Sequence, residues 1–325
     1  MLIFLKCHDI GKQKKSSIVA IFGIGLIGSC LARTLKQYQY ETAYNLPFSW
    51  QHSSHRIIEK EDIKYCIRRI SNNVNGTAFH DADSQCRIDF VWSAGKGGFD
   101  IKQNDTTPEM DSFSEVLEMA LAVSRENPSS QVGFHMVSSA GGLFEGQRNV
   151  EIASEPSPRR PYAIMKLAQE NILNDCDGLV RFIYQPTSVY GFAGLNRRMG
   201  LIPTLLWNGS KNKVSTIFGA PETLRDYVWV GDIGNFMAGM ISSKTSVSNR
   251  FILASGKPSA LFEVVNRIEN TLNKKLFCHY IKSGGNAEHN TFSPKTHPVG
   301  WNPLDMETGI RKTHNGIATG FDYIQ

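Results

Sequence analysis

The sequence predicts an α/β fold built on a doubly wound parallel sheet. Three observations carry this prediction: an apolar, β-branched run at residues 18–22 that breaks into glycines, two further apolar runs at residues 88–92 and 132–137, and amphipathic segments between them. Apolar strands that alternate with helices are typical of parallel sheets covered by helices on both faces. The 325 residues suffice for one large domain or two modest ones.

Composition is that of an ordinary globular protein, with 41% hydrophobic and 20% charged residues. The net charge of +5 comes from Lys and Arg spread along the chain, so we predict no nucleic-acid partner. The six cysteines form no Cys-x-x-Cys pair and no zinc spacing with His, which fits a reducing cytoplasm and predicts no metal site. The apolar residues 1–5 stop at Lys6, too short for a signal peptide or a membrane span. We therefore expect no membrane insertion and assign residues 1–16 to an N-terminal extension.

The first apolar run leads into Gly-x-Gly-x-x-Gly and then into a helical pattern, which is the setting of a dinucleotide-binding turn. Gly23 allows the tight turn, Gly25 lets the backbone approach a pyrophosphate, and Gly28 lets the helix pack on the strand. The helix N-terminus faces the anion. We expect Gly23, Gly25, Leu26, Ile27 and Gly28 to bind NAD or NADP.

The acidic residue expected about 20 positions after this motif, which would hold the adenosine ribose, is missing. Glu41 is nearest by count, but residues 43–47, the expected end of the second strand, contain no acid. Without an acid at this position, the site is compatible with the 2′-phosphate of NADP. His52, His55 and Arg56 just downstream are either phosphate ligands or parts of a solvated loop, and we favour the loop. The choice between NAD and NADP stays open.

The strand at residues 88–92 ends in small residues that suit the close approach of a cofactor, and Ala94, Gly95 and Lys96 are expected to flank it. An amphipathic helix is predicted for residues 109–125 and another for residues 59–73.

Tyr162 and Lys166 are four residues apart, so on a helix their side chains lie one turn apart on the same face. An ammonium group within about 4–6 Å favours the phenolate form of a tyrosine, which makes Tyr162 a candidate acid/base. Ser139, at the end of the strand at residues 132–137, is placed to donate a hydrogen bond to the same substrate oxygen. Taken alone, Tyr-x-x-x-Lys also arises by chance on amphipathic helices.

Several motifs, taken in order, resemble those of the extended short-chain dehydrogenase/reductases, the NAD-dependent epimerase/dehydratase family that acts on nucleotide-activated sugars. The resemblance covers nearly everything after residue 16. The matching segments are residues 25–29, 137–140, 162–166, 185–191, 225–232, 300–303 and 309–313.

The resemblance implies a role for each matching residue. It makes Tyr162 the general acid/base and Lys166 the residue that holds the nicotinamide ribose and favours the phenolate. Ser139 would hydrogen-bond the reacting oxygen, with Ser138 as the alternative serine. Arg225 matches the arginine that grips the nucleotide diphosphate, against the plainer reading of a surface arginine at a strand end.

The resemblance also implies a Rossmann-type fold with a smaller C-terminal substrate-binding lobe, and a homodimer. Residues 17–190, rejoined by about 226–235, would form the NAD(P)-binding domain, and residues 191–325 mainly the substrate lobe. Helical residues 201–207 are either a substrate wall or plain core, and we favour core.

Departures from the family pattern limit what can be transferred. Phe22 replaces the first glycine of the motif, Tyr44 stands where the ribose-binding Asp is expected, and Gln185 replaces an arginine, although we keep it as a substrate-binding candidate. Sugar 4,6-dehydratases carry Asp-Glu directly after the catalytic Ser or Thr, and Ala140-Gly141 stand there instead, which disfavours dehydration.

What remains is an NAD(P)-dependent nucleotide-sugar epimerase or 4-keto reductase/dehydrogenase. The alternative is a dinucleotide-binding sensor or structural subunit without catalysis, for which the altered glycine motif and the missing acid would be expected changes.

Overall fold

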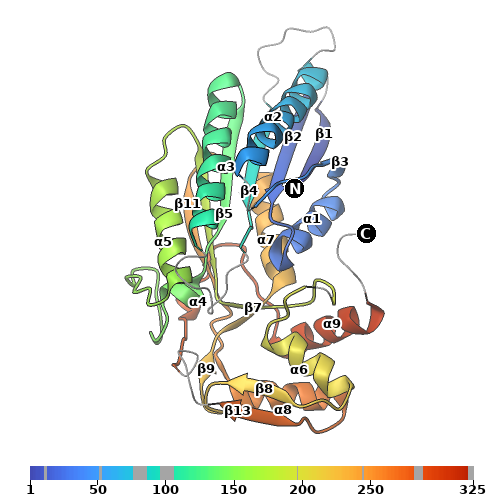
Figure 1. Cartoon of the computed structure of the whole chain (residues 1–325), viewed down its shortest axis with the longest axis vertical. Coiled ribbons are helices and arrows are strands. Elements are labelled where there is room, and N and C mark those ends of the chain that lie inside the picture. Colours follow the sequence, from blue (N-terminus) through green and yellow to red (C-terminus); the bar gives the residue numbers. More distant parts are fainter. Residues whose placement is uncertain are drawn as a thin grey trace. The chain divides into compact units, whose positions relative to one another are not determined.

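A computed structural model of the chain describes residues 1–10, 13–50, 53–75, 86–95, 106–195, 197–243, 245–281 and 288–320 (Figure 1). The chain divides into two compact units. The first unit comprises Met1–Ser138, Arg160–Tyr184 and Met237–Arg250; the second comprises Ser139–Arg159, Gln185–Phe236 and Phe251–Gln325.

A seven-stranded sheet, in the strand order β11-β6-β5-β4-β2-β1-β3, organises the first unit, and its strands β6 and β11 end in residues of the second unit. The strands are β1 (Leu2–Ile10), β2 (Gln13–Phe22), β3 (Glu41–Asn45), β4 (Arg87–Trp92), β5 (Gln131–Val137), β6 (Val180–Pro186) and β11 (Asn249–Leu253). Strands β2, β4, β5 and β6 pair in parallel. The predicted doubly wound α/β fold with a mostly parallel sheet is confirmed.

Helices cover both faces of this sheet (Figure 1). The helices of the first unit are α1 (Leu26–Gln37), α2 (Ser53–Asn75), α3 (Thr107–Glu126), α5 (Pro161–Asn174) and the second part of α7 (Val230–Ser243). Alternate strand residues point to one face, where Phe22, Phe90 and Phe134 form a core with α2 and α3 and have no exposed surface. Each such phenylalanine contributes about 1.5–3 kcal/mol by leaving water.

The N-terminal segment is part of the sheet. β1 pairs antiparallel with β2 on one side and with β3 on the other, and its residues Ile3 and Phe4 have no exposed surface. The sequence predicts an N-terminal extension at residues 1–16, because the apolar run at residues 1–5 is too short for a signal peptide or a membrane span. The burial of that run explains the difference, and β3 is consequently separated from β2 by one strand.

A charged network lies on the opposite face of the sheet, within the core. Arg87 on β4 makes an ion pair of 2.9 Å with Asp89, whose carboxylate also lies 3.0 Å from Nε2 of His135. Nδ1 of His135 is 2.9 Å from the Tyr184 hydroxyl. Burial lowers the pKa of His135, so the ring is neutral. Because an ionised carboxylate only accepts, Nε2–H donates to Asp89 and the Tyr184 hydroxyl donates to Nδ1.

The second unit contains three two-stranded sheets and several helices. Its strands are β7 (Ser188–Tyr190), β8 (Ser215–Phe218), β9 (Leu224–Arg225), β10 (Tyr227–Trp229), β12 (Ser259–Ala260) and β13 (Cys278–Ile281). Its helices are α4 (Ala140–Leu143), α6 (Leu201–Ser210), the first part of α7, α8 (Leu261–Leu272), α9 (Met306–Thr319) and the short 3-10 helix η2 (Pro294–Thr296). The strands pair as β7 with β10, β9 with β12 and β8 with β13.

Helix α6 contains residues 201–207, for which the sequence left two alternatives, a substrate wall or plain core. Its residues Ile202, Leu205 and Leu206 have no exposed surface and pack with α8 and α9 in the core of the second unit. Trp207 is partly buried against the same core, with the ammonium of Lys211 at 3.7 Å from its ring centroid. The expectation that this segment is core is confirmed. Across the described ranges, no helix is both long and apolar enough to cross a membrane.

Candidate active site

The glycine motif forms a tight turn between β2 and α1 in the first unit. Gly23 has φ of +93°, which side-chain-bearing residues rarely adopt, and a Cβ built on it would lie 2.4 Å from the Cα of Ala94. A Cβ on Gly28 would lie 2.0 Å from the carbonyl oxygen of Gly23. The Ser93 hydroxyl donates to that same oxygen at 2.7 Å. The turn is therefore fixed by glycine at both positions and by the end of β4.

Gly25 is the N-cap of α1 and borders open space. A Cβ on Gly25 would meet no described atom within 4 Å. The first turn of α1, which is described in full, holds no acidic side chain, and Leu26 and Ile27 provide its first backbone N–H groups. An open N-terminus of a 12-residue helix is a natural site for an anion.

The end of β4 meets this turn. Ala94 is 8% exposed and packs against Gly23, and Gly95 follows it. Lys96, the third residue expected to flank a cofactor, lies outside the described residues.

Helix α5 brings Tyr162 and Lys166 together, as their spacing predicted. Pro161 begins the helix, Tyr162 lies in its first turn, and Lys166 follows one turn later. The ammonium of Lys166 is 5.9 Å from the centroid of the Tyr162 ring, and Lys166 is 2% exposed. A charge so shielded acts on its neighbours through a low dielectric.

Glu109 is a member of this group that the sequence analysis did not single out. It lies in the first turn of α3, and its Oε1 is 3.1 Å from Nζ of Lys166. Gln169, one turn further along α5 and with no exposed surface, accepts a second hydrogen bond from Nζ at 3.1 Å. An acid at the start of the helix that follows a parallel strand was the available signal, since such helix ends lie at the carboxyl edge of the sheet.

The two candidate serines belong to different units. Ser138 ends the first unit, is 3% exposed, and its hydroxyl has no hydrogen-bond partner among the described residues. Ser139 begins the second unit and caps α4, where its Oγ accepts from the backbone N–H of Gly142 at 3.2 Å. That contact uses an oxygen lone pair and leaves the hydroxyl proton for donation.

The other predicted substrate residues lie in the second unit. Gln185 has no exposed surface, and Arg225 lies on β9, partly buried. Asp226, whose role the sequence did not indicate, directly follows β9 and accepts hydrogen bonds of 2.8 Å from the Thr187 hydroxyl and from the backbone N–H of Ser255. Asp226 therefore fixes the strand that carries Arg225.

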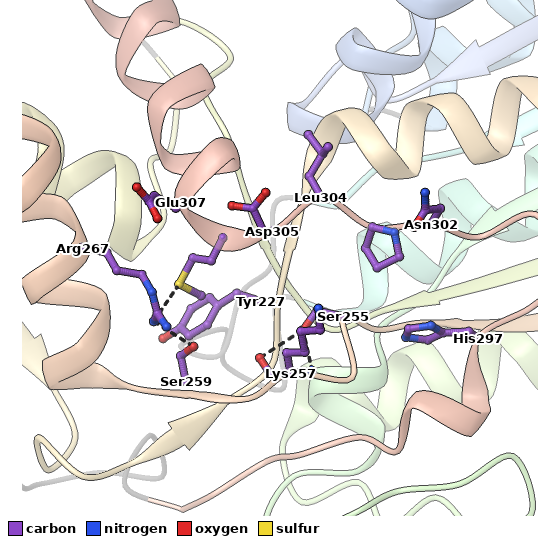
Figure 2. A pocket seen from close by; sticks show the side chains of 12 residues that line it. Tyr227, Ser255, Lys257, Ser259, Arg267, His297, Asn302, Leu304, Asp305 and Glu307 are labelled. Atoms are coloured by element: carbon purple, nitrogen blue, oxygen red, sulfur yellow. Dashed lines mark hydrogen bonds between the residues drawn. The ribbon is translucent and has the colours of Figure 1, made fainter.

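The second unit also holds a cavity of about 340 Å³ (Figure 2). Two cations line it, Lys257 and Arg267, and so do two acids, Asp305 and Glu307. Arg267 donates to Ser259 Oγ at 3.1 Å, and Figure 2 shows this contact beside Tyr227. Among the described residues, none of the predicted catalytic, cofactor-binding or substrate-binding side chains lines the cavity, although Tyr227, Asn302 and Pro303 belong to segments that match the family pattern. Its balanced charges select neither an anion nor a cation.

Asp232, at the start of α7, accepts a hydrogen bond of 3.0 Å from the backbone N–H of Leu304, at the cavity wall. Burial raises the pKa of the Asp232 carboxyl to about 6. The folded state therefore keeps its proton to a higher pH than the unfolded chain does. This group favours folding most below about pH 4, and the benefit is lost as the pH rises through about 6.

Asp232→Asn should consequently stabilise the protein at pH 8, by about 1 kcal/mol because solvent screens part of the shift, and leave stability at pH 4 nearly unchanged. The asparagine oxygen can still accept from Leu304. Thermal unfolding at the two pH values measures this. The matched change Glu222→Gln on an exposed residue should have no such pH dependence, and an equal effect of Asp232→Asn at both values would contradict the prediction.

Metal ions are not indicated: within the ranges that the structure describes, no three His, Cys, Asp or Glu side chains group so as to hold one.

Comparison with known proteins agrees with this geometry. Residues 19–253 match the profile of the NAD dependent epimerase/dehydratase family. The chain belongs to this family. The match begins in β2 and runs through the glycine turn, the Tyr162–Lys166 pair and Arg225.

Three similar proteins share 25% or less of their aligned residues with this chain. A provisionally named UDP-glucose 4-epimerase of Methanocaldococcus jannaschii is 25% identical over 187 residues, which span 54% of this chain and 60% of the relative. The structure of Thermus thermophilus UDP-glucose 4-epimerase in complex with NAD is 20% identical, covers 92% of this chain and 98% of its own, and has a TM-score of 0.69. UDP-glucose 4-epimerase of Thermotoga maritima, solved with UDP-glucose, is 17% identical at a TM-score of 0.68, with 93% of this chain and 98% of its own covered. These two structures establish the shared fold.

A nicotinamide dinucleotide, the cofactor that the family name implies, fits the glycine turn of this family member. Open space at Gly25 admits a pyrophosphate, and the uncapped N–H groups at the start of α1 match its charge. At the adenosine end, Tyr44 on β3 is an edge-strand residue, set apart from β2 by β1. Arg56, a candidate ligand for a 2′-phosphate, is 2% exposed and paired with Glu115 at 2.8 Å.

Gly25→Ala should weaken NAD binding at least about tenfold, because the new methyl group fills the space beside the helix N-terminus. Gly239→Ala is the matched control, since a Cβ there also meets no described atom within 4 Å. Isothermal titration with NAD measures both variants. If Gly25→Ala and Gly239→Ala bound NAD with equal affinity, the prediction that the pyrophosphate binds at this turn would be wrong.

Proposed function

We propose that the protein is an NAD-dependent enzyme that moves hydride to and from a carbon of a nucleotide-activated sugar. The observation that carries the proposal is the Tyr162–Lys166 pair, with a buried ammonium 5.9 Å from the tyrosine ring in a chain of this family. NAD is favoured over NADP because Arg56 is already held by Glu115.

In this proposal Tyr162 takes the proton of the sugar hydroxyl as hydride leaves the same carbon, which gives a ketone. Bound NAD supplies the hydride acceptor. Lys166 favours the phenolate of Tyr162 and holds the nicotinamide ribose through a remaining N–H. Ser139 donates a hydrogen bond to the reacting oxygen, with Ser138 as the alternative.

The nucleotide part is assigned to the second unit. Arg225 is proposed to bind the diphosphate, because a guanidinium offers two parallel donors to phosphate oxygens, and Gln185 to contact the substrate. Asp226 supports Arg225 by fixing its strand through Thr187 and Ser255.

Two reactions share this chemistry. Return of the hydride to the opposite face of the ketone makes a 4-epimerase, and release or uptake of the ketone makes a dehydrogenase or 4-keto reductase. Dehydration is disfavoured, because Ala140 and Gly141 stand where a dehydratase needs Asp-Glu. UDP-glucose is the first substrate to test, given the names of the relatives.

A thermal-shift screen tests the proposal. NAD and NADP are each combined with a panel of UDP-sugars, and products are then analysed. NAD should raise the unfolding temperature, and at least one UDP-sugar should raise it further. Absence of any shift with either dinucleotide would favour a structural subunit, and a shift with NAD but turnover of no sugar would favour a sensor.

A homodimer is part of the proposal. Ile164 and Ile172 lie two turns apart on α5 and are 53% and 36% exposed, so an apolar stripe of that helix is open for a second copy. Light scattering on a chromatography column measures the mass. A monomer at micromolar concentration would contradict this part.

A further inference from the structure

The Lys166 ammonium is shared between two buried acceptors. Oε1 of Glu109 and Oε1 of Gln169 each lie 3.1 Å from Nζ, and the side chains of Lys166 and Glu109 are 3% and 9% exposed. An ammonium has three N–H donors, so the third has no partner among the described residues. Lys166 is therefore held in place with one donor left for a ligand.

Glu109 also lies beside Gly95, which the sequence predicts to flank a cofactor. A Cβ on Gly95 would lie 3.4 Å from Oε1 of Glu109, so the carboxylate lies against the end of β4. In the ion pair, the negative charge of Glu109 offsets part of the positive charge that Lys166 presents to Tyr162.

We propose that Glu109 is a positioning residue that acts through Lys166: its carboxylate aligns the ammonium and sets how strongly that ammonium favours the Tyr162 phenolate. The inference rests on the proposed roles of Tyr162 and Lys166.

Substitution of Glu109 leaves the other charged and titratable residues around Lys166 unchanged. Glu170 lies on α5 one turn beyond Lys166 and is 2% exposed. Arg181 on β6 bonds the carbonyl oxygens of Asn174 and Cys176 at the far end of α5. His135 points to the face of the sheet that holds Asp89 and Tyr184. A change confined to Glu109 therefore isolates its charge.

Glu109→Gln removes the charge and keeps an oxygen that can accept from Lys166. We would follow the ionisation of Tyr162 in the protein without substrate by NMR of ¹³C-labelled tyrosine, with the signal identified by its loss in Tyr162→Phe. The midpoint should fall by about half to one pH unit in Glu109→Gln, as expected for one unit charge several ångströms away at intermediate dielectric. The exposed Glu118→Gln on the same helix is the control and should leave the midpoint unchanged.

A second variant gives the opposite sign and covers the case in which Glu109→Gln does not fold. Gln169→Glu places another carboxylate beside Nζ and should raise the midpoint. A residue with only a structural role would alter the yield of folded protein and leave the midpoint where it is. Unchanged midpoints in the folded variants would overturn the proposal.

The rate profile then links the inference to the reaction. The acid limb of the rate of hydride exchange should move in Glu109→Gln by the same amount and in the same direction as the NMR midpoint. A moved NMR midpoint without hydride exchange to any UDP-sugar would refute the proposed function and leave the role of Glu109 standing. A moved midpoint with an unmoved rate profile would overturn the role of Glu109 in the reaction.

Discussion

Replacement of Tyr162 by Phe should lower the rate of hydride exchange with a UDP-sugar by about 10²–10⁴-fold, which is the usual contribution of a positioned acid or base. The change removes one oxygen atom from a half-buried side chain of α5 and leaves the ring that packs 5.9 Å from Nζ of Lys166. Affinity for NAD should consequently stay within about threefold of the wild type, because the ribose contacts of Lys166 are kept.

Tyr65→Phe provides the matched control. Tyr65 is 61% exposed on α2, so loss of its hydroxyl should alter neither rate nor affinity. The two variants are compared by kcat with a saturating UDP-sugar and by titration with NAD. An unchanged kcat in Tyr162→Phe would end the assignment of Tyr162 as the acid/base.

Asp89→Asn should lower the free energy of unfolding by about 3–5 kcal/mol, because it leaves the buried guanidinium of Arg87 without its counter-charge. Asp89 has no exposed surface and also accepts from Nε2 of His135. Gly133 on β5 leaves the space that the Asp89 carboxylate occupies, since a Cβ on Gly133 would lie 2.2 Å from Oδ1 of Asp89. The remaining carbonyl oxygen of Asn can serve His135 but carries no charge.

Urea unfolding measures the loss, with Glu41→Gln on the exposed strand β3 as a control for removal of an acid. The double change Arg87→Met with Asp89→Leu should recover only part of the stability: it removes both charges of the buried ion pair, but it leaves Nε2–H of His135 without its acceptor. A loss below about 1 kcal/mol in Asp89→Asn would show that Arg87 is solvated in the folded protein.

Local patterns made much of the fold predictable from the sequence. The glycine turn depends on conformations and close approaches that residues 23–28 impose themselves, and the structure has them at Gly23 and Gly28. The Tyr162–Lys166 pair is set by helical periodicity alone. In the same way, the apolar spacing of residues 201–207 correctly placed α6 in the core.

Features that depend on distant pairing were not predictable. β1 is joined to the sheet by hydrogen bonds with β2 and β3. Five apolar residues followed by a lysine do not by themselves indicate an inner strand of a sheet. The ion pair of Arg87 with Asp89 was not predictable either, because it depends on the packing that buries both side chains. Glu109 and Lys166 are 57 positions apart, so their ion pair follows from the placement of α3 beside α5.

The central claim is that hydride leaves a sugar carbon and is handled by Tyr162 and NAD. The most direct measurement is the rate of turnover of UDP-glucose, or of the UDP-sugar that stabilises the NAD-bound protein most, with deuterium in place of hydrogen at C4. We expect slower turnover of the deuterated sugar, with the label recovered either at C4 of the epimer or in reduced NAD. Hydride transfer at C4 would be contradicted if the deuterated sugar turned over at the same rate and the label appeared neither at C4 of the epimer nor in reduced NAD.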